Sequence, residues 1–235
     1  MTVSFSVTIA KRGLRLGIGY VALASFMTVL GVIISGLGGV IPSEVKGLPS
    51  GVDLSTYFGL IGVPLVSLGG LMAAMPVTLL FVHDKDNGTL EYLLSMGFDQ
   101  RDIFRTYLAA SLLLGLPLLV IGGAAASAID VFAGQGAALA GTVLVCILAL
   151  GLAVIALTTI LMSAFSALQK QPLGMNQPLG IAIGAFVLVG AMMAPVAMPE
   201  NALIVELAIA GIVVAVSLML LALTPRLIRR EKMLP

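Results

Sequence analysis

The chain has 235 residues, of which 60% are hydrophobic and only 10% are charged, and its formal net charge is +1. Soluble domains carry roughly 25% charged residues, so this composition excludes a soluble globular protein and indicates an integral membrane protein. The single cysteine, Cys146, has no partner for an internal disulfide and leaves the redox compartment open.

Six uncharged stretches are long enough to cross a hydrocarbon core of about 30 Å, which takes about 20 apolar residues. They run from Leu16 to Ser43, Leu54 to Val82, Thr106 to Ile129, Val131 to Gln169, Gln171 to Pro199 and Leu207 to Pro225. These runs are continuous, whereas the strands of membrane barrels are short and alternate. We therefore expect an all-α integral membrane protein whose six transmembrane helices form a single domain over residues 1–235.

The fourth stretch, of 39 residues, is long enough to suggest two helices. Its first residues include Gly134, Gln135 and Gly136, which favour a loop, so we predict one helix from Ala137 to Phe165. Glycine is also abundant, with 27 residues, and the pair Gly13 and Gly17 has the small-xxx-small spacing that lets membrane helices approach closely.

Lysine and arginine near span ends remain in the cytoplasm, and this predicts the orientation. With a cytoplasmic N-terminus, eleven of the twelve basic residues fall inside and only Lys46 falls outside. The cytoplasmic parts are then the N-terminal segment 1–15, the loop 83–104 and the tail 226–235, in a multi-pass protein of the cell membrane. Such a basic face is typical of topology determinants beside lipid headgroups, so we expect the lipid bilayer as a partner and no nucleic acid.

The loop 83–104 has internal structure. After Gly88, three leucines recur at helical spacing and predict a short amphipathic helix that ends at Gly97: Leu90, Leu93 and Leu94. Asp99, with Asp102 three residues later, is placed to cap the helix that follows. The leucine stripe needs a cover, which could be the bilayer surface, neighbouring helices or a groove in another protein.

The motif Asp84-Lys85-Asp86-Asn87-Gly88-Thr89-Leu90-Glu91-Tyr92-Leu93-Leu94-Ser95 resembles the cytoplasmic loop of permeases of ABC-2 type ABC transporters. Where this family usually has a proline and a basic residue, the chain has Gly97 and Gln100. The short motif covers about 20 residues, and the six-span plan extends the likeness loosely over most of the chain. The resemblance also implies an interfacial helix before the first span, although Thr2 to Ile9 alternate polar and apolar residues as a strand does.

The resemblance implies that the loop is a coupling helix that docks on a separate ATP-binding subunit through Gly88, Thr89, Leu90, Glu91, Leu93 and Leu94. It also implies a second copy of this permease or a similar one, and export as the direction of transport. The sequence contains no G-x-x-x-x-G-K-[ST], so we expect no phosphate-binding loop of this kind, no catalytic residues and no cofactor in this chain. ATP and Mg²⁺ are expected in the partner subunit.

Two other classes of function remain open. An ion-coupled secondary transporter places ionisable residues at membrane depth, and the candidates here are Asp130 and Glu206. Both fall at predicted outer ends of spans, where we expect hydrated interfacial positions. An intramembrane enzyme needs clustered polar residues, but the only histidine, His83, falls at the cytoplasmic edge of the second span, and no metal site is expected.

Overall fold

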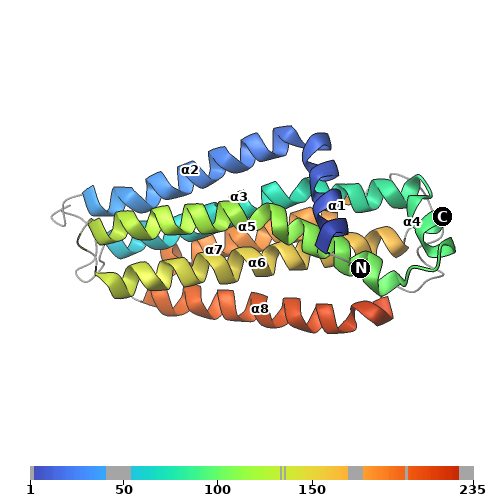
Figure 1. Cartoon of the computed structure of the whole chain (residues 1–235). Helices are drawn as coiled ribbons and strands as arrows, with labels where there is room; N and C mark the ends of the chain where they lie inside the picture. Colours follow the sequence, from blue (N-terminus) through green and yellow to red (C-terminus); the bar gives the residue numbers. More distant parts are fainter. Residues whose placement is uncertain are drawn as a thin grey trace.

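The computed structural model describes residues 3–40, 54–132, 134, 136–168, 177–198 and 201–227. This part of the chain is all-helical and contains no strand. Figure 1 shows its eight helices: α1 (Val3–Leu16), α2 (Ile18–Val40), α3 (Leu54–Asp86), α4 (Thr89–Ser95), α5 (Gln100–Phe132), α6 (Ala137–Leu168), α7 (Gln177–Ala197) and α8 (Ala202–Leu227).

Five of these helices are long and apolar enough to cross a membrane, so the chain has the build of a multi-pass membrane protein. The apolar segments are Ile18–Leu37, Phe58–Asp86, Gln100–Phe132, Ala137–Ala164 and Ala202–Thr224. The remaining predicted span corresponds to α7, whose described apolar part, Ile181–Met193, is shorter. The whole of α7 has 21 residues, or about 31 Å, so a sixth crossing stays a prediction.

The long helices lie side by side, and α3 is central among them, packing against α2, α5, α6 and α7. The short helix α1 crosses the direction of the long helices, and α1, α4 and the last turn of α8 lie at the same end of the bundle (Figure 1). The first described helix and the end of the last one therefore lie at one end of the bundle. Which side of the membrane that is stays a prediction; Lys46, Lys170 and residues 228–235 lie outside the described residues.

Two predictions about helix boundaries are confirmed. The fourth stretch forms the single helix α6, which begins at Ala137 as predicted. Before it, Gly134 and Gly136 have φ values of 80° and 83°, in the left-handed region that favours glycine. The N-terminal segment is helical from Val3 to Leu16, as the family resemblance implies, and the strand suggested by the alternation of Thr2 to Ile9 is wrong.

The start of α5 at Gln100 follows the predicted cap residue Asp99 directly, but the end of α3 differs from the sequence prediction. The helix α3 continues beyond the apolar stretch, which ends at Val82, as far as Asp86. Charged residues end the hydrophobic segment but do not end a helix, whose backbone hydrogen bonds continue beyond the bilayer core. At 33 residues each, α3 and α5 are about 50 Å long and exceed the core by about 20 Å.

Glycines bring helices close together inside the chain. A Cβ atom added at Gly13 would lie 2.8 Å from Val77 Cγ2, and one added at Gly17 would overlap the ring of Pro76. The predicted pair Gly13 and Gly17 therefore lets the junction of α1 and α2 pack in close contact with α3.

Candidate functional site

The short helix that the sequence predicts after Gly88 is present as α4, from Thr89 to Ser95. Gly88 precedes it with φ 72°, and Gly97 follows it with φ 86°. The Gly97 N–H donates to the Leu94 carbonyl (3.1 Å) and the Phe98 N–H donates to the Leu93 carbonyl (3.2 Å). This pair of bonds is a Schellman motif, which satisfies the last carbonyls of the helix and turns the chain back toward α5.

The leucine stripe of α4 is covered by the chain itself. Leu90 is 0% exposed and Leu94 is 4% exposed, while Leu93 is half-buried. They join a cluster, here called the α4 cluster, whose buried members come from α1, α3, α4, α5 and α6: Ile9, Ala10, Val77, Leu80, Phe81, Leu90, Leu94, Ile103, Phe104, Tyr107, Leu108, Ala110 and Ile160.

The burial changes what these leucines do. Fully burying a leucine stabilises a protein by roughly 1.5–3 kcal/mol, and a seven-residue helix is too short to persist alone. Leu90 and Leu94 therefore hold α4 on its own bundle. They were expected to face a partner subunit, and in the structure of the chain by itself both are buried. Of the three covers that the sequence left open, packing against neighbouring helices is the one observed.

The outward side of α4 and the turn after it carry exposed side chains. Glu91 is exposed, Tyr92 is 63% exposed and Met96 is 59% exposed, and Phe98 beyond the helix is 39% exposed. Of the predicted docking residues, only Glu91 lies fully on this side; Gly88 and Thr89 are partly exposed at its start. This surface, here called the α4 outer face, consists of Glu91, Tyr92, Met96 and Phe98.

A buried ionic cluster lies next to α4, and sequence reasoning missed it. Asp84, in the last turn of α3, is 0% exposed. Its Oδ1 lies 2.9 Å from the Arg12 Nη2 of α1, and the Arg12 Nη1 donates to Oδ2 at 3.1 Å. The Tyr107 hydroxyl of α5 donates to Oδ2 at 2.5 Å. Two donors from two other helices thus compensate the buried carboxylate.

The neighbouring basic residue makes a link to a further helix. Lys85 is only 6% exposed, and its Nζ donates a hydrogen bond to the Ser166 carbonyl of α6. The acidic-basic pair that begins the family-like motif therefore joins the end of α3 to α1, α5 and α6. Both residues can be read from the sequence, but their partners lie in other helices. No pattern near Asp84 or Lys85 in the sequence predicts these pairings.

Asp130 and Glu206 do not occupy the hydrated interfacial positions expected for them. Both are 0% exposed and face the inside of the bundle. The Ser35 hydroxyl of α2 donates to Asp130 Oδ1 at 3.4 Å, while Asp130 Oδ2 and both Glu206 oxygens have no hydrogen-bond partner among the described residues. Neighbouring helices bury these two carboxylates. The hydropathy of a single segment does not predict such burial, because it contains no information about the neighbouring helices.

His83 lies exposed in the last turn of α3, with its Nε2 2.8 Å from the Asn87 Nδ2. Within the described ranges, no three His, Cys, Asp or Glu side chains come together as a metal site would require. Comparison of the chain with protein-family models, with curated proteins and with solved structures found no match.

Proposed function

We propose that this chain is the membrane subunit of an ATP-driven transporter of the ABC-2 permease type, and that α4 couples it to a separate ATP-binding subunit. The observation that carries the proposal is the structure around α4: a seven-residue helix whose apolar side is buried in its own bundle and whose other side presents aromatic and thioether groups. Export is the direction that the family resemblance implies.

The α4 outer face is suited to a protein partner. It lies at one end of the bundle (Figure 1), beside α3 and α5, which are both longer than a crossing of the hydrocarbon core requires. Exposed Tyr92, Met96 and Phe98 have apolar surface there, and Glu91 adds one charge. Aromatic side chains and methionine are enriched at protein interfaces. A groove in the ATP-binding subunit would bury these apolar side chains, whereas contact with water leaves their apolar surface exposed.

The contacts around α4 would transmit a displacement of that helix to the long helices. Leu90 and Leu94 pack α4 against α3 and α5. The ion pair of Asp84 joins α3 to α1, and the hydrogen bond of Lys85 joins α3 to α6. Because packed interiors transmit displacement with little compression, these helix ends move together. The partner supplies ATP binding and hydrolysis with its Mg²⁺, and a second permease completes the pathway.

The test is to solubilise the full chain gently from its own cells and to identify and quantify co-purifying chains by mass spectrometry. We expect an ATPase with a phosphate-binding loop. The variant Tyr92→Asp/Met96→Asp places two charges on the α4 outer face. It should reduce recovery of that ATPase about 30-fold, because truncating an interface hot spot costs about 2 kcal/mol or more.

The matched control is Asn87→Asp/Ser95→Asp, which adds the same two charges at exposed positions of this region and retains Tyr92 and Met96. It should retain most of the ATPase. If no such ATPase co-purifies from any gentle detergent, or if both variants retain it fully, α4 is not the coupling element. Substituting Leu90 or Leu94 is a poor test, because an aspartate there would disrupt the α4 cluster itself.

Ion-coupled transport is the second candidate, and the burial of Asp130 and Glu206 favours it. In reconstituted vesicles with a proton gradient and no ATPase, this alternative expects transport that Asp130→Asn/Glu206→Gln abolishes. ATP-dependent transport that survives the double substitution would exclude it.

A further inference from the structure

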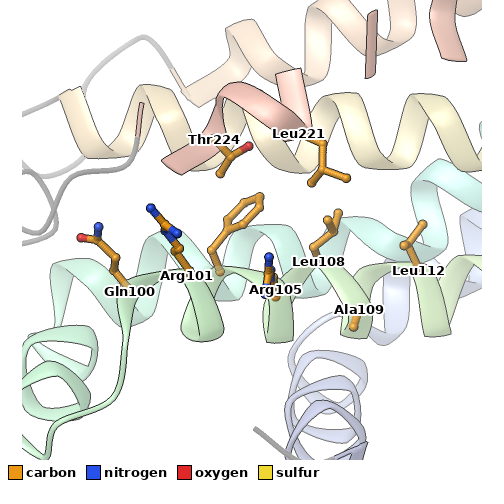
Figure 2. Close-up of a pocket in the computed structure, with 9 residues that line it drawn as sticks. Gln100, Arg101, Arg105, Leu108, Ala109, Leu112, Leu221 and Thr224 are labelled. Carbon is orange, nitrogen blue, oxygen red and sulfur yellow. The ribbon is translucent and has the colours of Figure 1, made fainter. Parts of the chain in front are cut away.

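A groove lies between the first three turns of α5 and the last turns of α8. Figure 2 shows it, with Arg101, Leu108 and Leu112 of α5 pointing toward Leu221 and Thr224 of α8. The helix α8 packs mainly on α6 and α7, and Leu221 and Thr224 in its last turns line the groove opposite α5. The groove encloses about 250 Å³.

One end of the groove is cationic. Arg101 and Arg105 line it, both are exposed, and neither makes an ion pair with any carboxylate in the part of the chain that the structure describes. The side-chain amide of Gln100 lies at the same end. The carboxylates nearest in sequence, Asp99 and Asp102, do not line the groove. Two guanidinium groups that pair with no described carboxylate offer a binding site for an anion, and they suit the oxygens of a phosphate.

The other end of the groove is apolar. Arg101, Arg105, Leu108 and Leu112 follow one another at helical spacings of four, three and four residues, so they form one stripe along α5. From Arg105 to Leu112 the stripe rises about 10 Å toward the hydrocarbon core. Leu221 of α8 faces this part and is 39% exposed, which leaves the groove open to the outside of the bundle.

We propose that this groove binds one anionic phospholipid, with its phosphate held between Arg101 and Arg105. One acyl chain lies along Leu108, Leu112 and Leu221. A soluble phosphate uses only the cationic end, and a neutral lipid uses only the apolar end. An anionic phospholipid matches both, and basic pockets between membrane helices are known to hold such headgroups. The inference does not depend on the coupling role of α4 and needs only that the long helices lie in a bilayer.

The experiment is native mass spectrometry of the full-length chain in detergent, titrated with phosphatidylglycerol, phosphatidylcholine or glycerol phosphate. The wild-type chain should bind phosphatidylglycerol well above the other two probes. The variant Arg101→Gln/Arg105→Gln should weaken phosphatidylglycerol binding about 30-fold and leave phosphatidylcholine binding unchanged, because each basic residue near an anionic lipid is worth roughly fivefold.

The matched control is Lys11→Gln/Arg15→Gln, which removes the same charge from exposed positions of α1 that do not line the groove. It should bind phosphatidylglycerol like the wild type. A second variant, Ala109→Trp, fills the apolar part through an exposed lining residue and keeps both arginines. It should also weaken binding.

The proposal is overturned if the wild-type chain binds phosphatidylglycerol and phosphatidylcholine equally, or if the control loses as much affinity as the groove variant. Equal affinity for glycerol phosphate and phosphatidylglycerol would reject the lipid and leave a phosphate site. If the arginine variant does not fold, Ala109→Trp decides: unchanged phosphatidylglycerol binding by that variant rejects the groove.

Discussion

Replacing Tyr107 with phenylalanine removes one hydroxyl group from the buried cluster around Asp84. The ring remains, including its edge-to-face contact with Phe81 at 5.2 Å between centroids, so packing is conserved. The 2.5 Å hydrogen bond from the hydroxyl to the Asp84 carboxylate is lost. Hydrogen bonds to charged groups contribute roughly 1.5–3 kcal/mol to stability. We expect Tyr107→Phe to lower the free energy of unfolding by about 2 kcal/mol.

The other substitutions at this cluster form an ordered series. Arg12→Gln should cost about 1 kcal/mol, because half-exposed ion pairs are screened by water and the Arg12 side chain is 50% exposed. Asp84→Ala removes both interactions and should cost about 3 kcal/mol. Since Arg12 and Tyr107 share one acceptor, the double variant should not show simple additivity.

The measurement is the unfolding of each full-length variant in mixed micelles as the fraction of dodecyl sulphate rises, followed by circular dichroism. Tyr92→Phe is the matched control, since Tyr92 is 63% exposed; it should stay within about 0.5 kcal/mol of the wild type. If Tyr107→Phe is no more destabilising than Tyr92→Phe, the hydroxyl does not stabilise Asp84, and the account of α1 being tied to α3 and α5 fails.

Two further predictions concern backbone geometry. Gly17→Val should destabilise the chain by about 1–3 kcal/mol in the same unfolding assay, because the valine side chain would clash with the ring of Pro76. The control is Gly19→Val, where nothing lies within 4 Å of an added Cβ atom, and it should cost less than half as much. Asp99→Ala should cost about 1 kcal/mol, because Asp99 precedes α5 and its Oδ1 accepts the Arg101 N–H at 3.4 Å. Hydrogen exchange should then show faster opening of the first turn of α5, and unchanged exchange there would contradict the cap.

Local patterns predicted the features that depend on neighbours along the chain. The apolar runs predicted α2, α3, α5, α6 and α8, and the glycines at 134 and 136 separated α5 from α6. Gly88, Gly97 and the leucine spacing between them predicted α4. Turn geometry and helical periodicity are encoded within a few residues, so such signals can be read from sequence.

Features that join distant segments were not predictable in this way. The charged residues around Asp84 indicated a solvated loop, yet the pairing of Asp84 with Arg12 and Tyr107 keeps that carboxylate inside the fold. Asp130 and Glu206 were expected in water and lie buried instead. Burial depends on which helix face meets which neighbour, and single-segment hydropathy does not contain that information.

The sequence alone determined that the chain is a helical membrane protein with a short helix between its second and third apolar stretches, because composition and helical period are local properties. Only the tertiary structure decided what covers that helix. Leu90 and Leu94 turn inward, and the exposed side carries Glu91, Tyr92 and Met96. The free energy of burying two leucines depends on the surfaces that α1, α3 and α5 bring to them, and those surfaces exist only once the helices have packed.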